Sequence, residues 1–64
     1  MSKLRRGGFV FLCWIGDHGP KHVHVYRNGC LIVKWDLDND KAMAGVASRK
    51  VLDLIRELRS EGLL

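Results

Sequence analysis

The chain has 64 residues and a formal net charge of +4, and 47% of its residues are hydrophobic. This length allows one small domain over residues 1–64, and the apolar content excludes a disordered chain. No apolar run approaches the roughly 20 residues that a membrane-spanning helix needs, which excludes an integral membrane protein.

Charge favours an anionic partner, and the cysteines favour a cytoplasmic protein, because Cys13 and Cys30 form no CxxC pair and are too few for a disulfide scaffold. Residues 1–34 carry six basic side chains and one acidic one, whereas residues 35–64 carry five basic and six acidic ones. The basic excess in the first half favours RNA, DNA or an acidic protein as partner, and a solvated basic surface without a partner is the alternative. The basic start is not followed by a small-residue cleavage site, so we expect no signal peptide.

The first half of the chain predicts a flexible arm and three strands. Residues 1–8 are predicted to form a flexible basic arm. "FVFLCWI" (9–15) is aromatic and β-branched and predicts a strand buried on both faces. "HVHVYR" (22–27) alternates with period two, and "CLIVKWDL" (30–37) predicts a third strand. Asn28-Gly29 between them is a strong hairpin signal, because a type I′ turn needs positive φ at both central residues.

The second half predicts a loop and a helix. Residues 38–47 are expected to form a loop, after which Ser48 can cap a helix that runs to about Ser60 and ends before Gly62. One stripe of this helix is apolar and consists of Val51, Leu52, Leu54, Ile55 and Leu58. The predicted fold is α+β, a three-stranded antiparallel meander followed by one C-terminal helix.

A two-residue turn at Asn28-Gly29 would pair Arg27 with Cys30 and would set the hairpin register. In that register one face carries His22, His24, Tyr26, Leu31, Val33 and Trp35. The opposite face carries Val23, Val25, Ile32 and Lys34. A bulge would reverse part of this assignment, because a slip of one residue exchanges the faces of a strand.

The predicted sheet has apolar surface on both sides, and a single helix can cover only one of them. Something else must then cover the second side. We expect a cognate small protein or a second copy of the chain to do so.

All three histidines of the chain, His18, His22 and His24, are clustered, and three interpretations stay open. Residues i and i+2 of a strand share a face, so His22 and His24, with His18 or Asp17 as a third ligand, could hold a divalent transition metal. No other cofactor is expected. Alternatively, the three histidines are acid–base catalysts for cleavage of RNA through its 2′-hydroxyl. In the third interpretation, which the residues alone favour most, His22 and His24 are structural and their ring nitrogens bond to backbone groups.

Several basic residues are candidates for binding phosphate or nucleic acid. Three lie in or next to the predicted hairpin, and two lie in the predicted arm. They are Lys21, Arg27, Lys34, Arg5 and Arg6.

The segment "DHGPKHVHV" (17–25) resembles a motif of the small bacterial family called domain of unknown function 4160. That motif reads Asp-His-x-Pro-Pro-His-Phe-His-Val, and it is matched here except that Lys21 replaces the second proline and Val23 replaces the phenylalanine. The resemblance implies one member of a toxin–antitoxin-type gene pair.

The leading hypothesis is therefore a toxin–antitoxin component that binds a cognate protein and acts on RNA or the translation machinery, with His22 and His24 at its functional centre and His18 nearby. The alternative is a non-catalytic regulatory module that binds nucleic acid or protein and whose histidines are structural. Whether the chain is an enzyme stays open at this point.

Overall fold

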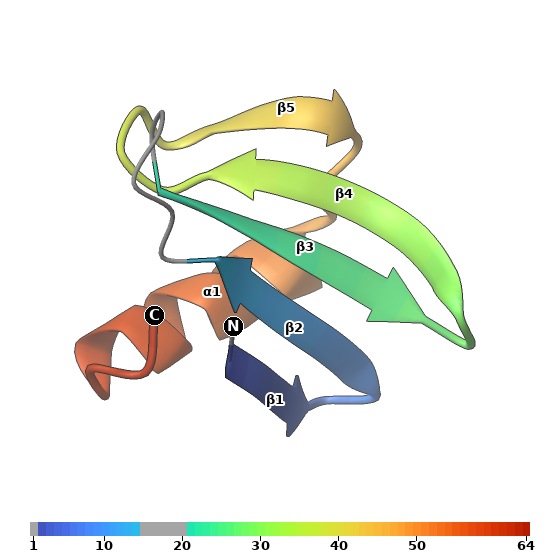
Figure 1. Cartoon of the computed structure of the whole chain (residues 1–64), viewed down its shortest axis with the longest axis horizontal. Helices are drawn as coiled ribbons and strands as arrows, with labels where there is room; N and C mark the ends of the chain where they lie inside the picture. The colour runs from blue at the N-terminus through green and yellow to red at the C-terminus, as the bar shows by residue number, and fades with distance from the viewer. Residues whose placement is uncertain (1, 15–20) are drawn as a thin grey trace.

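The computed structural model describes residues 2–14 and 21–64. Over these residues five strands precede one helix (Figure 1). The elements are β1 (Ser2–Arg6), β2 (Phe9–Trp14), β3 (His22–Arg27), β4 (Cys30–Asp36), β5 (Lys41–Gly45) and α1 (Arg49–Ser60). The strands form one antiparallel sheet in chain order, so the predicted three-stranded meander is wrong. The fold is α+β, with an edge strand added on each side of the predicted three.

The edge strand β1 replaces most of the flexible arm predicted for residues 1–8. Gly7 and Gly8 have φ angles of +60° and +83° and form the tight turn between β1 and β2. Positive φ at both central residues matches the right-handed twist of a hairpin. β1 therefore pairs with β2 along its whole length, from Ser2 opposite Cys13 to Arg6 opposite Phe9.

The other edge strand, β5, falls inside the loop predicted for residues 38–47. Its sequence, "KAMAG", is poor in the β-branched and aromatic residues that favour strands. All five of its residues are exposed, and it pairs with β4 alone. Tertiary pairing, rather than local propensity, makes this segment a strand.

The β3–β4 hairpin begins in the predicted register and then departs from it. Asn28 and Gly29 have φ angles of +53° and +78°, which confirms the two-residue turn. Arg27 pairs with Cys30 and Tyr26 with Leu31, as predicted.

A bulge then shifts the register of this hairpin by one residue. Val25 pairs with Val33, which leaves Ile32 as the extra residue of β4. As a result His24 is opposite Lys34, and Val23 is opposite Trp35. The prediction that Trp35 and Val33 share a face with the histidines is wrong, because the bulge turns both toward the other side of the sheet.

Helix α1 lies across one face of the sheet (Figure 1). The bounds predicted for it are confirmed: the Ser48 Oγ accepts a hydrogen bond from the Val51 N–H at 3.3 Å, and the helix ends at Ser60. The residues buried between helix and sheet are Phe9, Phe11, Cys13, Val23, Val25, Val33, Leu37, Val51, Leu54, Ile55 and Leu58. No helix within residues 2–14 and 21–64 is long and apolar enough to cross a membrane.

Ion pairs connect the edge strand β1 to the end of α1. The Arg6 Nη1 donates to Glu57 Oε1 at 3.0 Å, and its Nη2 donates to Glu61 Oε1 at 2.9 Å. A further contact joins Arg6 Nη1 to Glu61 Oε2. The hydrogen bonds from Arg6 lower the pKa of the Glu61 carboxyl, and those to Glu61 raise the pKa of Arg6. The charge of Arg6 is thus neutralised within the chain.

Gly45 is expected to be essential to the sheet, because a side chain there has no space. Its φ is +76°, and a Cβ would lie 2.3 Å from the carbonyl oxygen of Ile32. Gly29 has nearly the same φ, +78°, with open space around it. We predict that Gly29→Ala lowers the free energy of unfolding by about 1 kcal/mol through backbone strain alone. Gly45→Ala should lower it by roughly 1–3 kcal/mol more, because of overpacking.

Urea denaturation of the two variants and the unsubstituted chain measures this difference. Equal losses of stability in Gly45→Ala and Gly29→Ala would contradict the close backbone contact between β5 and the bulge.

Candidate nucleic-acid interface

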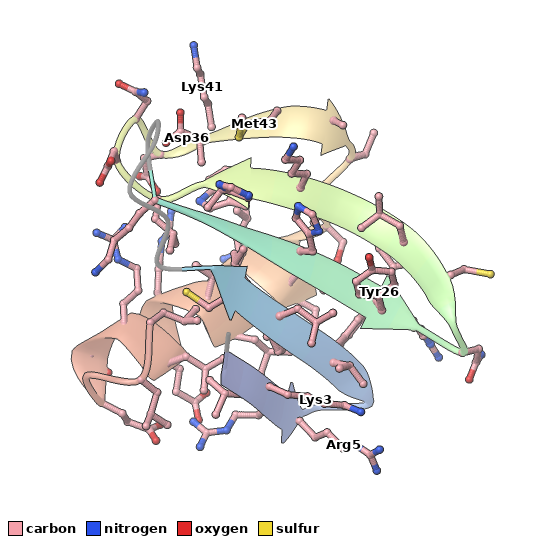
Figure 2. The ribbon with its side chains drawn as sticks, in the orientation of Figure 1. Lys3, Arg5, Tyr26, Asp36, Lys41 and Met43 are labelled. Carbon is pink, nitrogen blue, oxygen red and sulfur yellow. The ribbon has the colours of Figure 1, made fainter. Side chains whose placement is uncertain are left out.

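The sheet surface turned away from α1 is called the open face. The residues of this face alternate along each strand with the buried residues of the core. They also lie opposite one another on neighbouring strands. They are Lys3, Arg5, Val10, Leu12, His22, His24, Tyr26 and Lys34. Figure 2 shows Lys3 and Tyr26 on this side of the sheet.

Three rings form a row along β3 on the open face. The ring centroids of His22 and His24 are 5.2 Å apart, and those of His24 and Tyr26 are 6.4 Å apart. The row follows from the period-two alternation of "HVHVYR", whose valines Val23 and Val25 are fully buried on the helix side. Strand β3 therefore presents a continuous row of aromatic rings on its partly exposed side.

His24 lies at the centre of this row and is partly buried. Its neighbours in register are Leu12 on β2 and Lys34 on β4. Burial lowers the pKa of the His24 imidazole, and the positive charges of His22 and Lys34 lower it further. Because this pKa lies below the ordinary histidine value of about 6.5, the ring is neutral at pH 7. One ring nitrogen is then a donor and the other an acceptor.

Cations flank the row of rings on both sides. Lys3 is in register with Leu12 and Arg5 with Val10 on the β2 side, while Lys34 lies opposite His24 on the β4 side. Within residues 2–14 and 21–64, the ion pairs of the structure involve Arg6 and Arg59 but none of these three cations. Their charge is thus available to an anionic partner.

The open face is hollowed between the β1 edge and the row of rings. The hollow has a volume of about 370 Å³ and is lined by Lys3, Val10, Leu12, Tyr26 and Gly29. Its lining is mostly apolar, and Lys3 and Tyr26 are its polar members. Its volume lies at the lower end of what small-molecule and cofactor sites offer.

One carboxylate, that of Asp36, lies opposite His22, but the turn after β4 engages it. Its Oδ1 accepts hydrogen bonds from the backbone N–H groups of Asp38 and Asn39, each at 3.0 Å, and its Oδ2 accepts one from the Asn39 amide at 2.7 Å. These bonds, the one from the Asn39 side chain above all, lower the pKa of Asp36. The residue terminates β4 rather than neutralising the cations of the open face.

The structure brings some of the predicted phosphate-binding residues together and separates others. Lys34 and Arg5 both lie on the open face. Arg6 is instead paired with helix carboxylates, and the Arg27 guanidinium lies 5.5 Å from the centroid of the Phe9 ring, a residue of the core. Lys21 stands at the far end of β3, where its N–H donates to Asp38 Oδ2 at 2.9 Å.

Three histidines were predicted to be catalytic or metal-binding. The rings of His22 and His24 are neighbours on the open face, and His18 lies outside the described residues. Asp17 lies outside them as well. The described residues contain no group of three or more His, Cys, Asp and Glu able to hold a metal ion. A metal site completed by His18 stays a prediction.

Sequence reasoning assigned no role to Val10, Leu12 or Tyr26, although they line the hollow together with Lys3. The missing signal was Gly7-Gly8, a dipeptide that can close a two-residue hairpin. Once this turn joins β1 to β2, alternation alone brings Lys3 next to Leu12 on the open face.

Comparison of the chain with family models, with curated proteins and with solved structures gives no match. The resemblance of residues 17–25 to the family called domain of unknown function 4160 therefore stays a prediction.

The depressed pKa of His24 can be tested directly. We expect His22→Gln and Lys34→Gln each to raise it, because each substitution removes a positive charge that opposes protonation. NMR titration of the His24 ring protons measures the shift, and Arg49→Gln, on the helix, is the control. A pKa of His24 that is unchanged in both open-face variants would contradict the described electrostatics.

The same shift predicts how folding stability depends on pH. The unfolded chain binds the His24 proton at the ordinary pKa of about 6.5, and the folded chain binds it only at lower pH. The neutral His24 ring therefore makes its full contribution to the free energy of unfolding above about pH 6.5. That contribution is lost as the pH falls through the pKa of His24 in the folded chain. Urea denaturation at several pH values should show a smaller acid loss for His24→Gln than for the unsubstituted chain.

Proposed function

We propose that the chain is a small RNA-binding component of toxin–antitoxin type, and that its open face binds single-stranded RNA. One observation carries the proposal: a row of three rings shares this face with three cations that form no ion pair within residues 2–14 and 21–64, while the neighbouring carboxylate of Asp36 is engaged by a turn.

Stacking supports the choice of a single strand. Unpaired bases stack on aromatic side chains, and sheet surfaces are common platforms for this contact. The phenol of Tyr26 borders the hollow, whose apolar floor of Val10 and Leu12 can receive the flat face of a base. In a duplex the bases are already stacked on each other and are not available in this way.

Charge supports an anionic polymer over a second copy of the chain. Lys3, Arg5 and Lys34 could each contact a phosphate of a strand that crosses the sheet. A second copy docked through the same face would bring these cations against their own equivalents, and such like-charge contacts disfavour association.

The neutral imidazole of His24 favours RNA over DNA. A neutral imidazole can exchange a hydrogen bond with a 2′-hydroxyl, which RNA carries. DNA lacks this group. Phosphates near His24 would also stabilise its protonated form, so RNA binding should strengthen as the pH falls.

The toxin–antitoxin part of the proposal rests on the motif in residues 17–25. A cognate protein would cover the apolar part of the open face at Val10 and Leu12 and would compete with RNA for it. A catalytic role of His22 and His24 would require RNA to be cleaved and not only bound, and it stays a prediction.

Binding of a short fluorescent oligouridine tests the proposal. Tyr26→Ala should weaken binding about tenfold, because loss of one base–aromatic stack costs roughly 1–3 kcal/mol. Tyr26→Phe, which keeps the ring, should bind nearly as the unsubstituted chain does. The double variant Lys3→Gln/Lys34→Gln should lower the slope of log affinity against log salt by about 1.4, since each phosphate contact of a single strand contributes about 0.7.

The helix offers a matched control for charge. Arg49→Gln/Lys50→Gln removes the same charge from exposed positions of α1 and should leave the salt slope unchanged. An equal effect of both double variants would mean that net charge alone attracts the RNA, and would refute an interface on the open face. Binding of oligodeoxyuridine with equal affinity would refute the preference for RNA.

A further inference from the structure

A second hollow lies on the opposite side of the sheet from the open face, between α1, the end of β4 and the turn that follows. Its volume is about 90 Å³. It is lined by Trp35, Asp40, Leu52, Ile55, Arg56 and Arg59, and we call it the Trp35 hollow. Liquid water occupies about 30 Å³ per molecule, so this space suits a small ion and not a nucleotide.

The indole of Trp35, which lines this hollow, carries a buried N–H donor. Its Nε1 is shielded from solvent and has no acceptor among residues 2–14 and 21–64. A buried N–H without an acceptor is unfavourable, and such groups in folded proteins usually bond to a water or a ligand. The position of Trp35 on this side of the sheet follows from the bulge at Ile32.

Two guanidinium groups from α1 also line the Trp35 hollow. Arg56 and Arg59 are three residues apart, which places them on the same side of the helix. Arg59 Nη1 lies 3.9 Å from Asp40 Oδ1, whereas Arg56 forms no ion pair with any residue that the structure describes. The lining therefore has two cations against one carboxylate, an excess of positive charge.

We propose that the Trp35 hollow binds a phosphate group, either as the free ion or as the end of a phosphomonoester. The planar fork of arginine matches the oxygens of phosphate, and the two guanidinium groups would hold it in competition with Asp40. The indole of Trp35 lines the same hollow. This site is independent of the RNA-binding function proposed for the open face.

NMR titration of the uniformly ¹⁵N-labelled chain tests the proposal. The indole N–H signal of Trp35 is assigned by its loss in Trp35→Phe. Inorganic phosphate and methyl phosphate are added separately, at an ionic strength held constant with sodium chloride. A saturable shift of the Trp35 signal is expected. Saturation by both compounds would identify a site open to monoesters, and saturation by inorganic phosphate alone would identify one for the free ion.

Substitutions then distinguish the Trp35 hollow from general attraction of anions. Arg56→Gln and Arg59→Gln should each weaken phosphate at least fivefold, while Asp40→Asn should tighten it by removing the competing carboxylate. Lys50→Gln and Asp53→Asn change the same charges at exposed positions outside the hollow and should leave binding unchanged.

Three results would overturn the proposal. They are a shift that never saturates, an equal response to added chloride, and an effect of Lys50→Gln as large as that of Arg56→Gln. None of them bears on RNA binding, which is measured on the open face by separate variants.

Discussion

The extra residue at Ile32 determines which side chains of β4 face the helix. Because successive side chains of a strand point to opposite faces, one additional residue reverses the orientation of those that follow it. The bulge turns Val33 and Trp35 toward α1 and Lys34 toward His24. In the unbulged register Lys34 would share a face with the buried valines of β3, where a lysine would lose its hydration without gaining a partner.

Both proposed sites depend on this shift. Lys34 and Trp35 are neighbours in the chain, yet Lys34 contributes charge to the open face and Trp35 lines the Trp35 hollow on the other side. The sheet between them is one layer thick, so a single register sets the chemistry of both sides. Gly45 completes the arrangement, because only a residue without a Cβ allows β5 to approach the bulged backbone at Ile32 so closely.

The sheet also divides the charges of the chain. On the helix side Arg6 is bound by Glu57 and Glu61, which connects the edge strand to the end of α1. On the open face the basic side chains of Lys3 and Lys34 have no such partner among the described residues. Three of the six basic residues of 1–34, Lys3, Arg5 and Lys34, therefore share the surface that carries the row of rings.

Local sequence was sufficient for the features whose signals are local. The turn at Asn28-Gly29, the cap at Ser48 and the shared face of His22 and His24 depend on residues close together in the chain, and each was predicted. The strand at residues 41–45 could not be predicted, because its weak propensity is overridden by pairing with β4. The bulge at Ile32 could not be predicted for a related reason. The local sequence pattern is compatible with either register of β4, and only the burial of Val33 and Trp35 against α1 selects one of them. The sequence by itself determined the helix, the central strands and the row of rings, whereas the tertiary structure decided the edges of the sheet and the side chains that share each face.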